Sequence, residues 1–285
     1  MGKIVDVVIN FDHNFISQAA VLAHSLNVNS SIEVLHVFYS GSAHKLNSYE
    51  NMLGPVKFKI QYYFVEDMIH KLPNKNTSSQ IPTISYARLL ITKLLNRDIK
   101  RVLYLDIDVL IKGPIDDLLQ FITIKPIAAV RSQREGFYNS RGEEVRKYFN
   151  AGVLLIDLEA LRISEYDEVI LKTMAISSPF EYMDQDILNL VFEDAWEELP
   201  QKWNFFSTKK LRYYQDDSEN VIVHFAGIHK PWVYPNLSVD HKKWRKLHLK
   251  LIPEVRKTFV DNSLTYYLVH NRFLRLILFR KPIKQ

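Results

Sequence analysis

The sequence predicts an α/β fold, in which a mixed or parallel sheet carries helices on both faces and a basic helical appendage follows. Two observations predict it. Short apolar runs alternate with amphipathic segments along most of the 285 residues, and the composition becomes strongly basic after residue 238. With 47% hydrophobic residues, the chain can bury a sizeable core. We therefore expect one domain over residues 1–238 and an amphipathic helical tail over residues 239–285.

The elements of the domain follow from the spacing of its apolar residues. Continuous or alternating apolar runs predict strands at 4–9, 33–39, 57–65, 102–105, 127–130, 152–158 and 221–225. Apolar residues three and four apart predict helices at 15–26, 42–53, 85–95, 160–175 and 184–194. The polar, irregular residues 131–147 are expected to form a loop over the functional site.

Two aspartates follow the apolar run 102–105, at the carboxyl end of a predicted buried strand. Asp106 and Asp108 are two residues apart, and such side chains point the same way on an extended segment. Their carboxylates would repel each other unless a cation lies between them, and a hard divalent ion that also binds a substrate phosphate fits this position. The alternative interpretation is that these aspartates cap a helix or close a turn.

Several kinds of site are excluded by what the sequence lacks. It has no cysteine, so it forms no disulfide and uses no thiol nucleophile. It has no Gly-rich phosphate loop and no nucleophile elbow. A bound nucleotide would therefore be held by a metal and isolated cations. His224 could supply an imidazole nitrogen, which favours Mn²⁺ over Mg²⁺, Gly227 allows close backbone approach, and Lys230 could neutralise a phosphate. His224 could instead be a buried, hydrogen-bonded core residue.

Six segments, in this order, resemble the family 8 retaining glycosyltransferases, and most closely the bacterial lipooligosaccharide galactosyltransferases. They are residues 10–15 (NFDHNF), 85–89 (SYARL), 104–109 (YLDIDV), 149–154 (FNAGVL), 182–189 (YMDQDILN) and 224–232 (HFAGIHKPW). The resemblance covers about residues 3–240. It implies a GT-A fold, a UDP-sugar donor and Mn²⁺ as the cofactor.

By position in these segments, the resemblance implies that Mn²⁺ is bound by Asp106, Asp108 and His224. It implies that the donor is bound by Asn10, Asp12, Phe15, Arg88, Asp106, Ile107, Asp108, Asn150, Ala151, Asp184, Gln185, Gly227 and Lys230. Within that set, Asp12 and Phe15 would read and stack on uracil. Simpler roles stay open for three of these residues: Phe15 as a core residue of its helix, Arg88 in a structural ion pair, and Asn150 in a turn.

The resemblance implies that Asp184 and Gln185 are the catalytic residues, with Gln185 nearest the reacting face of the anomeric carbon. The alternative is that Asp184 and Asp186 are first-turn acids of a helix, and this can hold for Asp186 alone. Retention could proceed through a covalent glycosyl-enzyme or by front-face attack. Because the amide of Gln185 is neutral and a poor nucleophile, we favour front-face displacement, in which a UDP oxygen accepts the acceptor's proton and the Gln185 carbonyl stabilises positive charge.

One residue departs from the family pattern. Arg131 stands where the family commonly has an acidic residue that binds sugar hydroxyls, and an arginine can only donate hydrogen bonds. A shifted Glu135 could take over this role. Galactose and glucose are therefore equal candidates for the donor sugar. A sugar-nucleotide hydrolase or nucleotidyltransferase stays open as an alternative function, and so does a catalytically silent UDP-sugar-binding protein.

The C-terminal stretch has a different character. Residues 241–285 hold 12 Lys/Arg and 2 Asp/Glu, whereas the other 240 residues hold 25 and 30. Basic residues interleaved with Leu, Phe and Trp are typical of segments that bind an anionic membrane surface. A helical dimer contact, or a helix covering the main domain, is the alternative. Nucleic acid is not an expected partner.

The expected location follows from segments that we do not find. The acidic Asp6 argues against a secretory signal, and no apolar run approaches the ~18 residues of a membrane span. We expect a cytoplasmic protein that lies peripherally on the inner face of a bacterial membrane and acts on a saccharide or glycolipid acceptor.

Overall fold

The computed structural model of the chain describes residues 6–73, 83–132, 136–138, 142–145, 147–175, 180–193, 195–207, 219–233 and 238–252. The chain divides into two compact units. The first unit comprises Met1–Phe206 and Asp217–His224, and the second comprises Ser207–Asp216 and Phe225–Gln285. The boundary that the sequence predicts after residue 238 stays a prediction.

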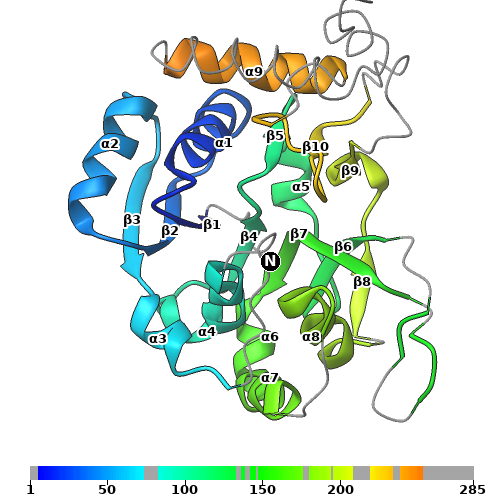
Figure 1. The fold of residues 1–285 in the computed structure, drawn as a ribbon. Helices are drawn as coiled ribbons and strands as arrows, with labels where there is room; N and C mark the ends of the chain where they lie inside the picture. Colours follow the sequence, from blue (N-terminus) through cyan, green and yellow to red (C-terminus); the bar gives the residue numbers. More distant parts are fainter. Residues whose placement is uncertain are drawn as a thin grey trace, which may run out of the picture. The chain divides into compact units, whose positions relative to one another are not determined.

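The first unit is built on a seven-stranded sheet (Figure 1). Its strand order is β3 (Lys59–Phe64), β2 (Val34–Ser40), β1 (Asp6–Asp12), β4 (Arg101–Leu105), β7 (Phe149–Asp157), β6 (Ile127–Arg131), β8 (Trp196–Glu198). The first four strands are parallel, β7 is antiparallel to both of its neighbours, and β8 is parallel to β6. A smaller sheet has the order β5 (Val109–Ile111), β10 (Ile222–His224), β9 (Phe205–Phe206).

Helices cover both faces of the large sheet, because successive strand residues point to opposite sides. Val7 and Ile9 of β1 pack into one apolar core with α1 (Ile16–Asn29), α2 (Ala43–Leu53), α5 (Asp116–Gln120) and η2 (Gln201–Trp203). Val8 packs into the opposite core with α3 (Glu66–His70), η1 (Thr83–Leu90), α4 (Ile91–Leu94), α6 (Leu158–Ile163), α7 (Tyr166–Ala175) and α8 (Met183–Val191). This arrangement confirms the predicted fold class.

The strand order locates the functional edge of this sheet. From β1 the chain proceeds outward to β2 and β3, whereas β4 pairs with the other side of β1. The order therefore reverses between β1 and β4. Ligands of open α/β sheets bind at such a switch point, outside the carboxyl ends of the strands. Asp106 follows the end of β4 directly.

Some predicted elements differ from the structure. The helix predicted at 160–175 is two helices, because Glu165 has a left-handed backbone (φ 53°) that ends α6 before α7 begins. The helix predicted at 85–95 is mostly the 3₁₀ helix η1, followed by one turn of α-helix. The predicted loop 131–147 contains a bridge between Tyr138 and Glu144. The prediction lacks the short elements α3, α5, β5, β8, η2 and β9. An element of two to five residues is too short to show an apolar periodicity.

In the second unit, the described helix is α9 (Val239–Leu251). Ser238 caps it by accepting a hydrogen bond from the backbone N–H of His241 at 3.2 Å. Trp244 is fully buried, stacks on His248 and contacts Trp232. The predicted amphipathic tail beyond residue 252 lies outside the described residues. None of the described helices combines the length and hydropathy that spanning a bilayer requires.

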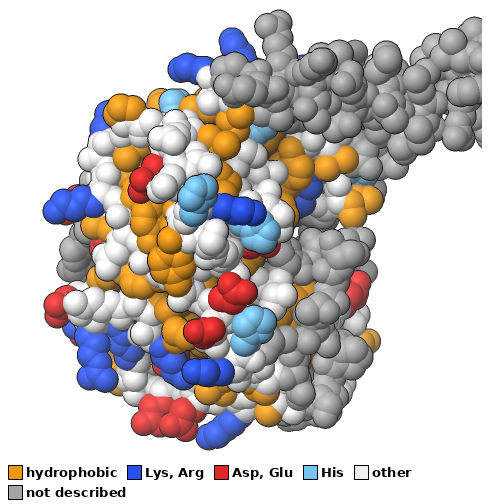
Figure 2. Space-filling model, turned by 60° about the vertical axis from the view of Figure 1, so that its left-hand side comes forward, with side chains coloured by type: hydrophobic (Ala, Val, Ile, Leu, Met, Phe, Trp, Pro, Cys, Tyr) orange, Lys and Arg blue, Asp and Glu red, His pale blue; other side chains and the backbone are white. Residues whose placement is uncertain are grey.

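Charges on the described surface are mixed. On the face in Figure 2, acidic, basic and histidine side chains are interspersed with hydrophobic ones. This agrees with the composition of residues 1–240, in which 30 acidic residues slightly outnumber 25 Lys/Arg.

Arg162 of α6 holds the segment that leads into β4. Its guanidinium donates to the carbonyls of Leu95 (3.0 Å), Asn96 (3.1 Å) and Ile99 (2.9 Å). These carbonyls belong to the C-cap residue of α4 and the loop after it, where no helical N–H is available to them. Arg162 thereby fixes the start of the strand that delivers Asp106.

We expect Arg162→Leu to lower the free energy of unfolding by about 2 kcal/mol, because several carbonyls lose a charged donor. Lys100→Met is the matched control. Its exposed ion pair with Glu159 (2.6 Å) contributes about 0–1 kcal/mol. Urea denaturation of both variants measures the difference, and equal losses would show that the Arg162 contacts contribute little.

Candidate active site

The three predicted metal ligands lie together in the first unit. Asp106, Asp108 and His224 each offer one ligand atom, and these atoms all lie within 4.8 Å of one another. His224 Nε2 is 3.2 Å from Asp108 Oδ1. The pairing of β5 with β10 brings them together, because His224 pairs with Val109, the residue after Asp108.

The two aspartates converge, but not because they lie on one extended strand, as the sequence predicts. β4 ends at Leu105, and the backbone N–H of Val109 donates to the carbonyl of Asp106 (3.3 Å). Asp106 and Asp108 therefore belong to a turn between β4 and β5, not to one extended strand. The alternative interpretation as turn residues holds for the backbone, and the side chains still meet.

Gly152 of β7 has no side chain, and the ring of His224 occupies the space that a side chain would fill. A Cβ atom at position 152 would lie 2.3 Å from Cε1 and 2.7 Å from Nδ1 of His224, which no real pair of atoms tolerates. The carbonyl of Gly152 also accepts the N–H of Asp106 at 2.8 Å. A glycine is therefore needed at position 152 because the His224 ring approaches the backbone closely, and not because of an unusual backbone angle.

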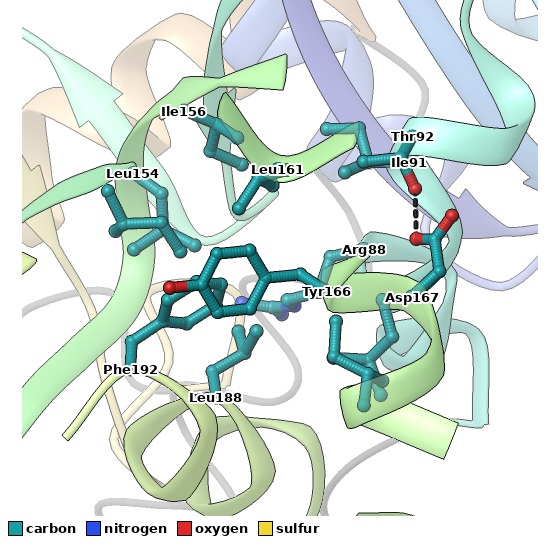
Figure 3. A pocket seen from close by; sticks show the side chains of 13 residues that line it. Arg88, Ile91, Thr92, Leu154, Ile156, Leu161, Tyr166, Asp167, Leu188 and Phe192 are labelled. Carbon is teal, nitrogen blue, oxygen red and sulfur yellow. Dashed lines mark hydrogen bonds between the residues drawn. The ribbon is translucent and has the colours of Figure 1, made fainter. Parts of the chain in front are cut away.

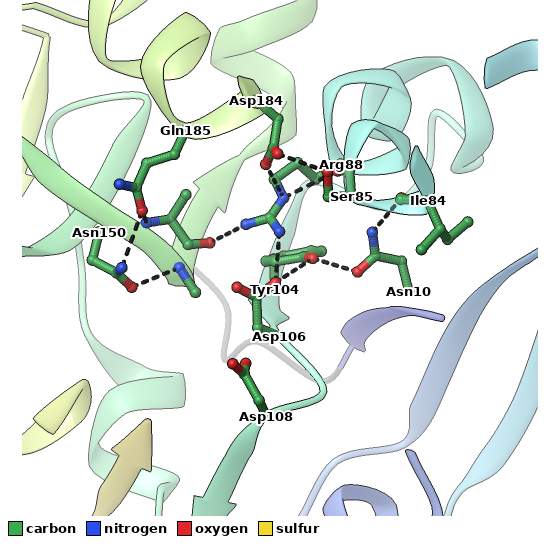
Figure 4. A network of polar contacts seen from close by, with 12 residues as sticks. Asn10, Ile84, Ser85, Arg88, Tyr104, Asp106, Asp108, Asn150, Asp184 and Gln185 are labelled. Carbon is green, nitrogen blue, oxygen red and sulfur yellow. Dashed lines mark hydrogen bonds and ion pairs between the residues drawn. The ribbon is translucent and has the colours of Figure 1, made fainter. Parts of the chain in front are cut away.

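Arg88 is the centre of a buried polar network, which Figure 4 shows. Its Nη2 lies 2.6 Å from Asp106 Oδ1, and its Nε lies 2.8 Å from Asp184 Oδ2. Its Nη1 donates to the carbonyl of Ala151 at 2.6 Å. The alternative role of Arg88, an ion pair with a carboxylate at the sheet, is thus present in the structure. Its partners are themselves predicted site residues.

The 3₁₀ geometry of η1 explains how one carboxylate receives two donors. In a 3₁₀ helix, residues three apart lie one above the other. Ser85 and Arg88 therefore both face Asp184, and Ser85 Oγ donates to Asp184 Oδ1 at 2.7 Å. Burial raises the pKa of the Asp184 carboxyl, and this outweighs the lowering by Arg88 and Ser85. Burial also lowers the pKa of Arg88, but Asp106 and Asp184 raise it by more.

Met183 places Asp184 at the start of α8. Met183 has a positive φ (48°) although it is not a glycine, and its side chain is buried in the core. Such a backbone is strained by about 1–3 kcal/mol and occurs preferentially at functional sites. Asp184 does not cap α8, because its carboxylate faces Arg88 and Ser85. Asp186 does act at this helix start, since it accepts the N–H of Tyr182 at 2.9 Å.

Asn10 and Tyr104 extend the network along β1 and β4. Asn10 Nδ2 donates to the carbonyl of Ile84 at 2.6 Å, and Tyr104 OH lies 2.5 Å from Asn10 Oδ1. Tyr104 OH is also 2.8 Å from Asp106 Oδ1, and its ring lies 4.5 Å from the guanidinium carbon of Arg88. Burial raises the pKa of Tyr104, so the phenol keeps its proton. Asn10 therefore supports the network, and its predicted contact with the donor stays a prediction.

Gln185 is held on three sides. Its Oε1 accepts from Asn150 Nδ2 and from the N–H of Ala151, both at 3.0 Å. Its Nε2 donates to Tyr148 OH at 3.0 Å, and Tyr148 OH donates to Asp186. Both lone pairs of the Gln185 carbonyl are thus used within the protein. The predicted role of this carbonyl at the anomeric centre stays a prediction.

The predicted uracil-binding residues lie after β1. Asp12 Oδ1 accepts the N–H of Asn14 at 2.7 Å, and its carbonyl accepts the N–H of Phe15 at 3.0 Å. Phe15 is partly buried against the apolar core around α1, so its alternative role in packing is present. Ile107 is likewise partly buried against that core.

The remaining predicted site residues lie elsewhere in the chain. Gly227 has a left-handed backbone (φ 78°) in the second unit, where Lys230 Nζ donates to the carbonyl of Phe225 at 2.9 Å. Their predicted contacts with phosphate stay predictions. Arg131 is exposed at the end of β6, next to a bulge between residues 129 and 131. Glu135 lies outside the described residues.

The residues present fit a divalent metal ion. Carboxylate oxygens and an imidazole nitrogen are ligands that Mn²⁺ and related ions accept. The charges agree with this, because Asp106 and Asp184 share the guanidinium of Arg88, while Asp108 adds a third carboxylate beside His224. A divalent cation would offset the excess negative charge.

A cavity lies on the far side of Arg88, between β7 and the helices that cover it (Figure 3). It is lined mainly by apolar side chains, such as Leu154, Tyr166 and Phe192. Its volume of about 20 Å³ is room for a water molecule and not for a sugar. This cavity is therefore a packing gap behind the site.

Sequence reasoning missed several residues of the site, namely Ser85, Tyr104, Tyr148, Gly152 and Asn204. Asn204 is fully buried and links two halves of the network, since its Nδ2 donates to Asn150 Oδ1 at 2.9 Å and its Oδ1 lies 3.0 Å from His224 Nδ1. Four of the five lie inside or next to the segments that carry the resemblance. Asn204 lies outside all six, and no signal in the sequence identifies it.

The chain also matches known proteins. The model of glycosyl transferase family 8 matches residues 6–235. The chain belongs to this family. The resemblance found in the sequence is confirmed, and Asp106, Asp108 and His224 form a possible site for a divalent ion.

Relatives of this family 8 chain include General stress protein A of Bacillus subtilis strain 168, which is 30% identical over 197 residues, or 62% of the chain and 68% of that protein. Lipopolysaccharide 1,2-glucosyltransferase of Escherichia coli is 29% identical over 192 residues, covering 61% of the chain and 56% of that protein. The chain thus spans little more than half the length of this glucosyltransferase.

A solved structure shares the fold of this family 8 chain. It is the galactosyltransferase LgtC in complex with donor and acceptor sugar analogues, with a TM-score of 0.68 and 23% identity. The match covers 89% of the chain and 99% of LgtC. At this identity the likeness shows the fold alone, which is of the GT-A type.

We expect Gly152→Ala to weaken the binding of a divalent ion at least about tenfold, because the new methyl group displaces the His224 ring. Electron paramagnetic resonance of free Mn²⁺ measures this affinity. Gly113→Ala is the matched control, since its Cβ would make an ordinary 3.8 Å contact with Val221. Equal affinity of Gly152→Ala and the wild type would argue against His224 as a ligand.

Proposed function

We propose that this chain is a retaining hexosyltransferase that moves galactose or glucose from a UDP-sugar to a saccharide or lipid-linked acceptor, with Mn²⁺ as cofactor. The observation that carries the proposal is the cluster of Asp106, Asp108 and His224 at the carboxyl end of β4, in a chain of family 8. These ligands suit an ion that also binds a diphosphate.

Residues of the chain prepare the departure of UDP. When bound, Mn²⁺ supplies a positive charge that offsets the charge developing on the leaving diphosphate. Asp106, Asp108 and His224 would hold it. Arg88 fixes Asp106 through its 2.6 Å contact, so this ligand is oriented before the substrate arrives. Gly227 and Lys230 are the proposed phosphate contacts, and Asn10, Asp12 and Phe15 are the proposed uridine contacts.

Front-face displacement is the proposed mechanism. The acceptor hydroxyl oxygen bonds to the anomeric carbon as the bond to the UDP oxygen breaks, and its proton passes to that leaving oxygen. The buried Asp184 carboxylate is engaged by Arg88 and Ser85, which disfavours it as a nucleophile. Asn150, Ala151 and Gln185 form the proposed surface for the donor sugar. In this arrangement Gln185 lies beside the anomeric centre and contributes its amide dipole.

The acceptor is proposed from relatives. Some relatives are named as lipopolysaccharide glucosyltransferases, so we propose a role in the synthesis of lipopolysaccharide or lipooligosaccharide. That role places the chain at the cytoplasmic face of a bacterial membrane. In support, α9 exposes a lysine face formed by Lys242, Lys243, Lys246 and Lys250. Such a face attracts anionic lipid headgroups.

We expect purified protein with Mn²⁺ to release UDP from UDP-galactose or UDP-glucose only when an oligosaccharide acceptor is present. A coupled assay for UDP over a panel of sugar nucleotides measures this. Removal of metal with a chelator, or the double substitution Asp106→Asn and Asp108→Asn, should reduce the rate at least about 100-fold.

Two outcomes would contradict the transferase. UDP release at the same rate without acceptor would indicate a hydrolase. A shift of the melting temperature by UDP-sugars without turnover on any acceptor would indicate a binding protein. Lys100→Met is the activity control. It removes only the exposed ion pair with Glu159 of α6 and should keep the wild-type rate.

We expect replacement of the α9 lysine face by glutamine (Lys242, Lys243, Lys246 and Lys250) to weaken binding to vesicles containing anionic lipid by about 100-fold or more. Each lysine near such a surface contributes ~1 kcal/mol. Sedimentation with vesicles at physiological salt measures it. The same change at four exposed lysines of the first unit (Lys45, Lys57, Lys59 and Lys71) is the control and should have little effect.

A further inference from the structure

We infer that Asn204 is a positioning residue that joins the metal-binding half of the site to the sugar-facing half. The inference rests on the proposed function and goes beyond it, since it assigns to one buried amide the orientation of both His224 and Gln185. Asn204 is fully buried and belongs to no predicted element or motif.

A continuous chain of hydrogen bonds runs through this residue. Gln185 Oε1 accepts from Asn150 Nδ2 at 3.0 Å, and Asn150 Oδ1 accepts from Asn204 Nδ2 at 2.9 Å. Asn204 Oδ1 is 3.0 Å from His224 Nδ1, and His224 Nε2 is 3.2 Å from Asp108 Oδ1. Three side chains, those of Asn150, Asn204 and His224, thus connect the proposed sugar contact Gln185 to the proposed metal ligand Asp108.

Backbone N–H groups fix the direction of every bond in this chain. A backbone N–H can only donate, so the atom of Asn150 that faces the N–H of Gly152 (2.9 Å) is the oxygen. Asn204 must then present its NH₂ group to that oxygen and its own oxygen to His224. At the other end, the N–H of Ala151 requires an oxygen from Gln185. If the amide of Gln185, Asn150 or Asn204 exchanged its O and N positions, a buried group would lose its hydrogen bond.

This direction determines the state of His224. Because Asn204 Oδ1 accepts, Nδ1 of His224 carries a proton, and in the neutral imidazole the lone pair is then on Nε2. That lone pair faces the carboxylate oxygen of Asp108 at 3.2 Å, and two acceptors at this distance repel each other. His224 and Asp108 would both hold a divalent ion at this position, and its charge would offset the repulsion. Asn204 therefore selects the tautomer that binds a metal, as outer hydrogen-bond partners of metal-bound histidines do.

The backbone around Asn204 explains why it can hold this position. Asn204 follows η2, and its N–H donates to the carbonyl of Gln201 at 3.1 Å. The next two residues form β9, where Phe206 pairs with His224 of β10. Strand pairing therefore brings the residue before β9 alongside the end of β10.

The oxygen and the nitrogen of the Asn204 amide have different partners, so two substitutions can distinguish a positioning role from a merely structural one. Asn204→Leu removes both hydrogen bonds, whereas Asn204→Asp keeps the acceptor for His224 and loses the donor to Asn150. We expect Asn204→Leu to raise the Kd for Mn²⁺ about 10–100-fold, as measured by electron paramagnetic resonance of the free ion. Asn204→Asp should keep the wild-type Kd within about threefold, yet lower kcat about tenfold in the UDP-release assay.

Asn27→Leu is the matched control, since Asn27 bonds the N–H of Lys57 outside the site and should leave both readouts unchanged. Thermal melting identifies any variant that fails to fold, and the split between Kd and kcat in Asn204→Asp then tests the inference by itself. Equal Mn²⁺ affinity in all variants, or equal loss in the two Asn204 variants, would overturn it. If the wild type itself binds no Mn²⁺, the proposed function fails first. If the wild type binds Mn²⁺ but turns over no donor, only the function fails, because the affinities still test Asn204.

Discussion

The pairing of Arg88 with the buried carboxylate of Asp184 and the partly buried one of Asp106 is the constraint on which the site depends. A guanidinium as buried as this one would be costly without partners, and the structure gives it Asp106, Asp184 and the carbonyl of Ala151. These partners lie just after β4, at the start of α8 and near the start of β7. One charge therefore fixes three elements of the first unit relative to each other. The same contacts leave an excess of negative charge at the switch point of the sheet, where ligands of open α/β sheets bind.

Most of the fold could be predicted from the sequence, because its main strands and helices carry clear apolar periodicities. The failures have physical causes. Glu165 ends a helix through an unusual backbone angle that no composition indicates, and in η1 the 3₁₀ geometry brings both Ser85 and Arg88 to Asp184, a residue far away in the sequence. Short strands such as β9 are stabilised by pairing with distant residues and not by local preference.

The candidate site likewise has residues that the sequence could predict and residues that it could not. Asp106, Asp108 and His224 could be predicted, because their residue types and the resemblance point to one chemistry, and the structure brings them together. Gly152 and Asn204 could not, because their roles arise from contacts across strands: Gly152 leaves space for a ring that is 72 residues later in the chain, and Asn204 acts through two other side chains. Residues of this kind are recognised only when the neighbours are known. Local sequence carries information about chemistry, whereas close approach and orientation are properties of the tertiary fold.

The left-handed Met183 limits how this scaffold can be redesigned. Two demands meet at that position: the backbone angle favours glycine or asparagine, whereas the surrounding core favours a large apolar side chain. Glycine would relieve the angle but leave a void, and asparagine would bury an amide among hydrocarbons. Substitutions in this scaffold are therefore better made at exposed strand ends such as Arg131, where neither demand applies, than at the start of α8.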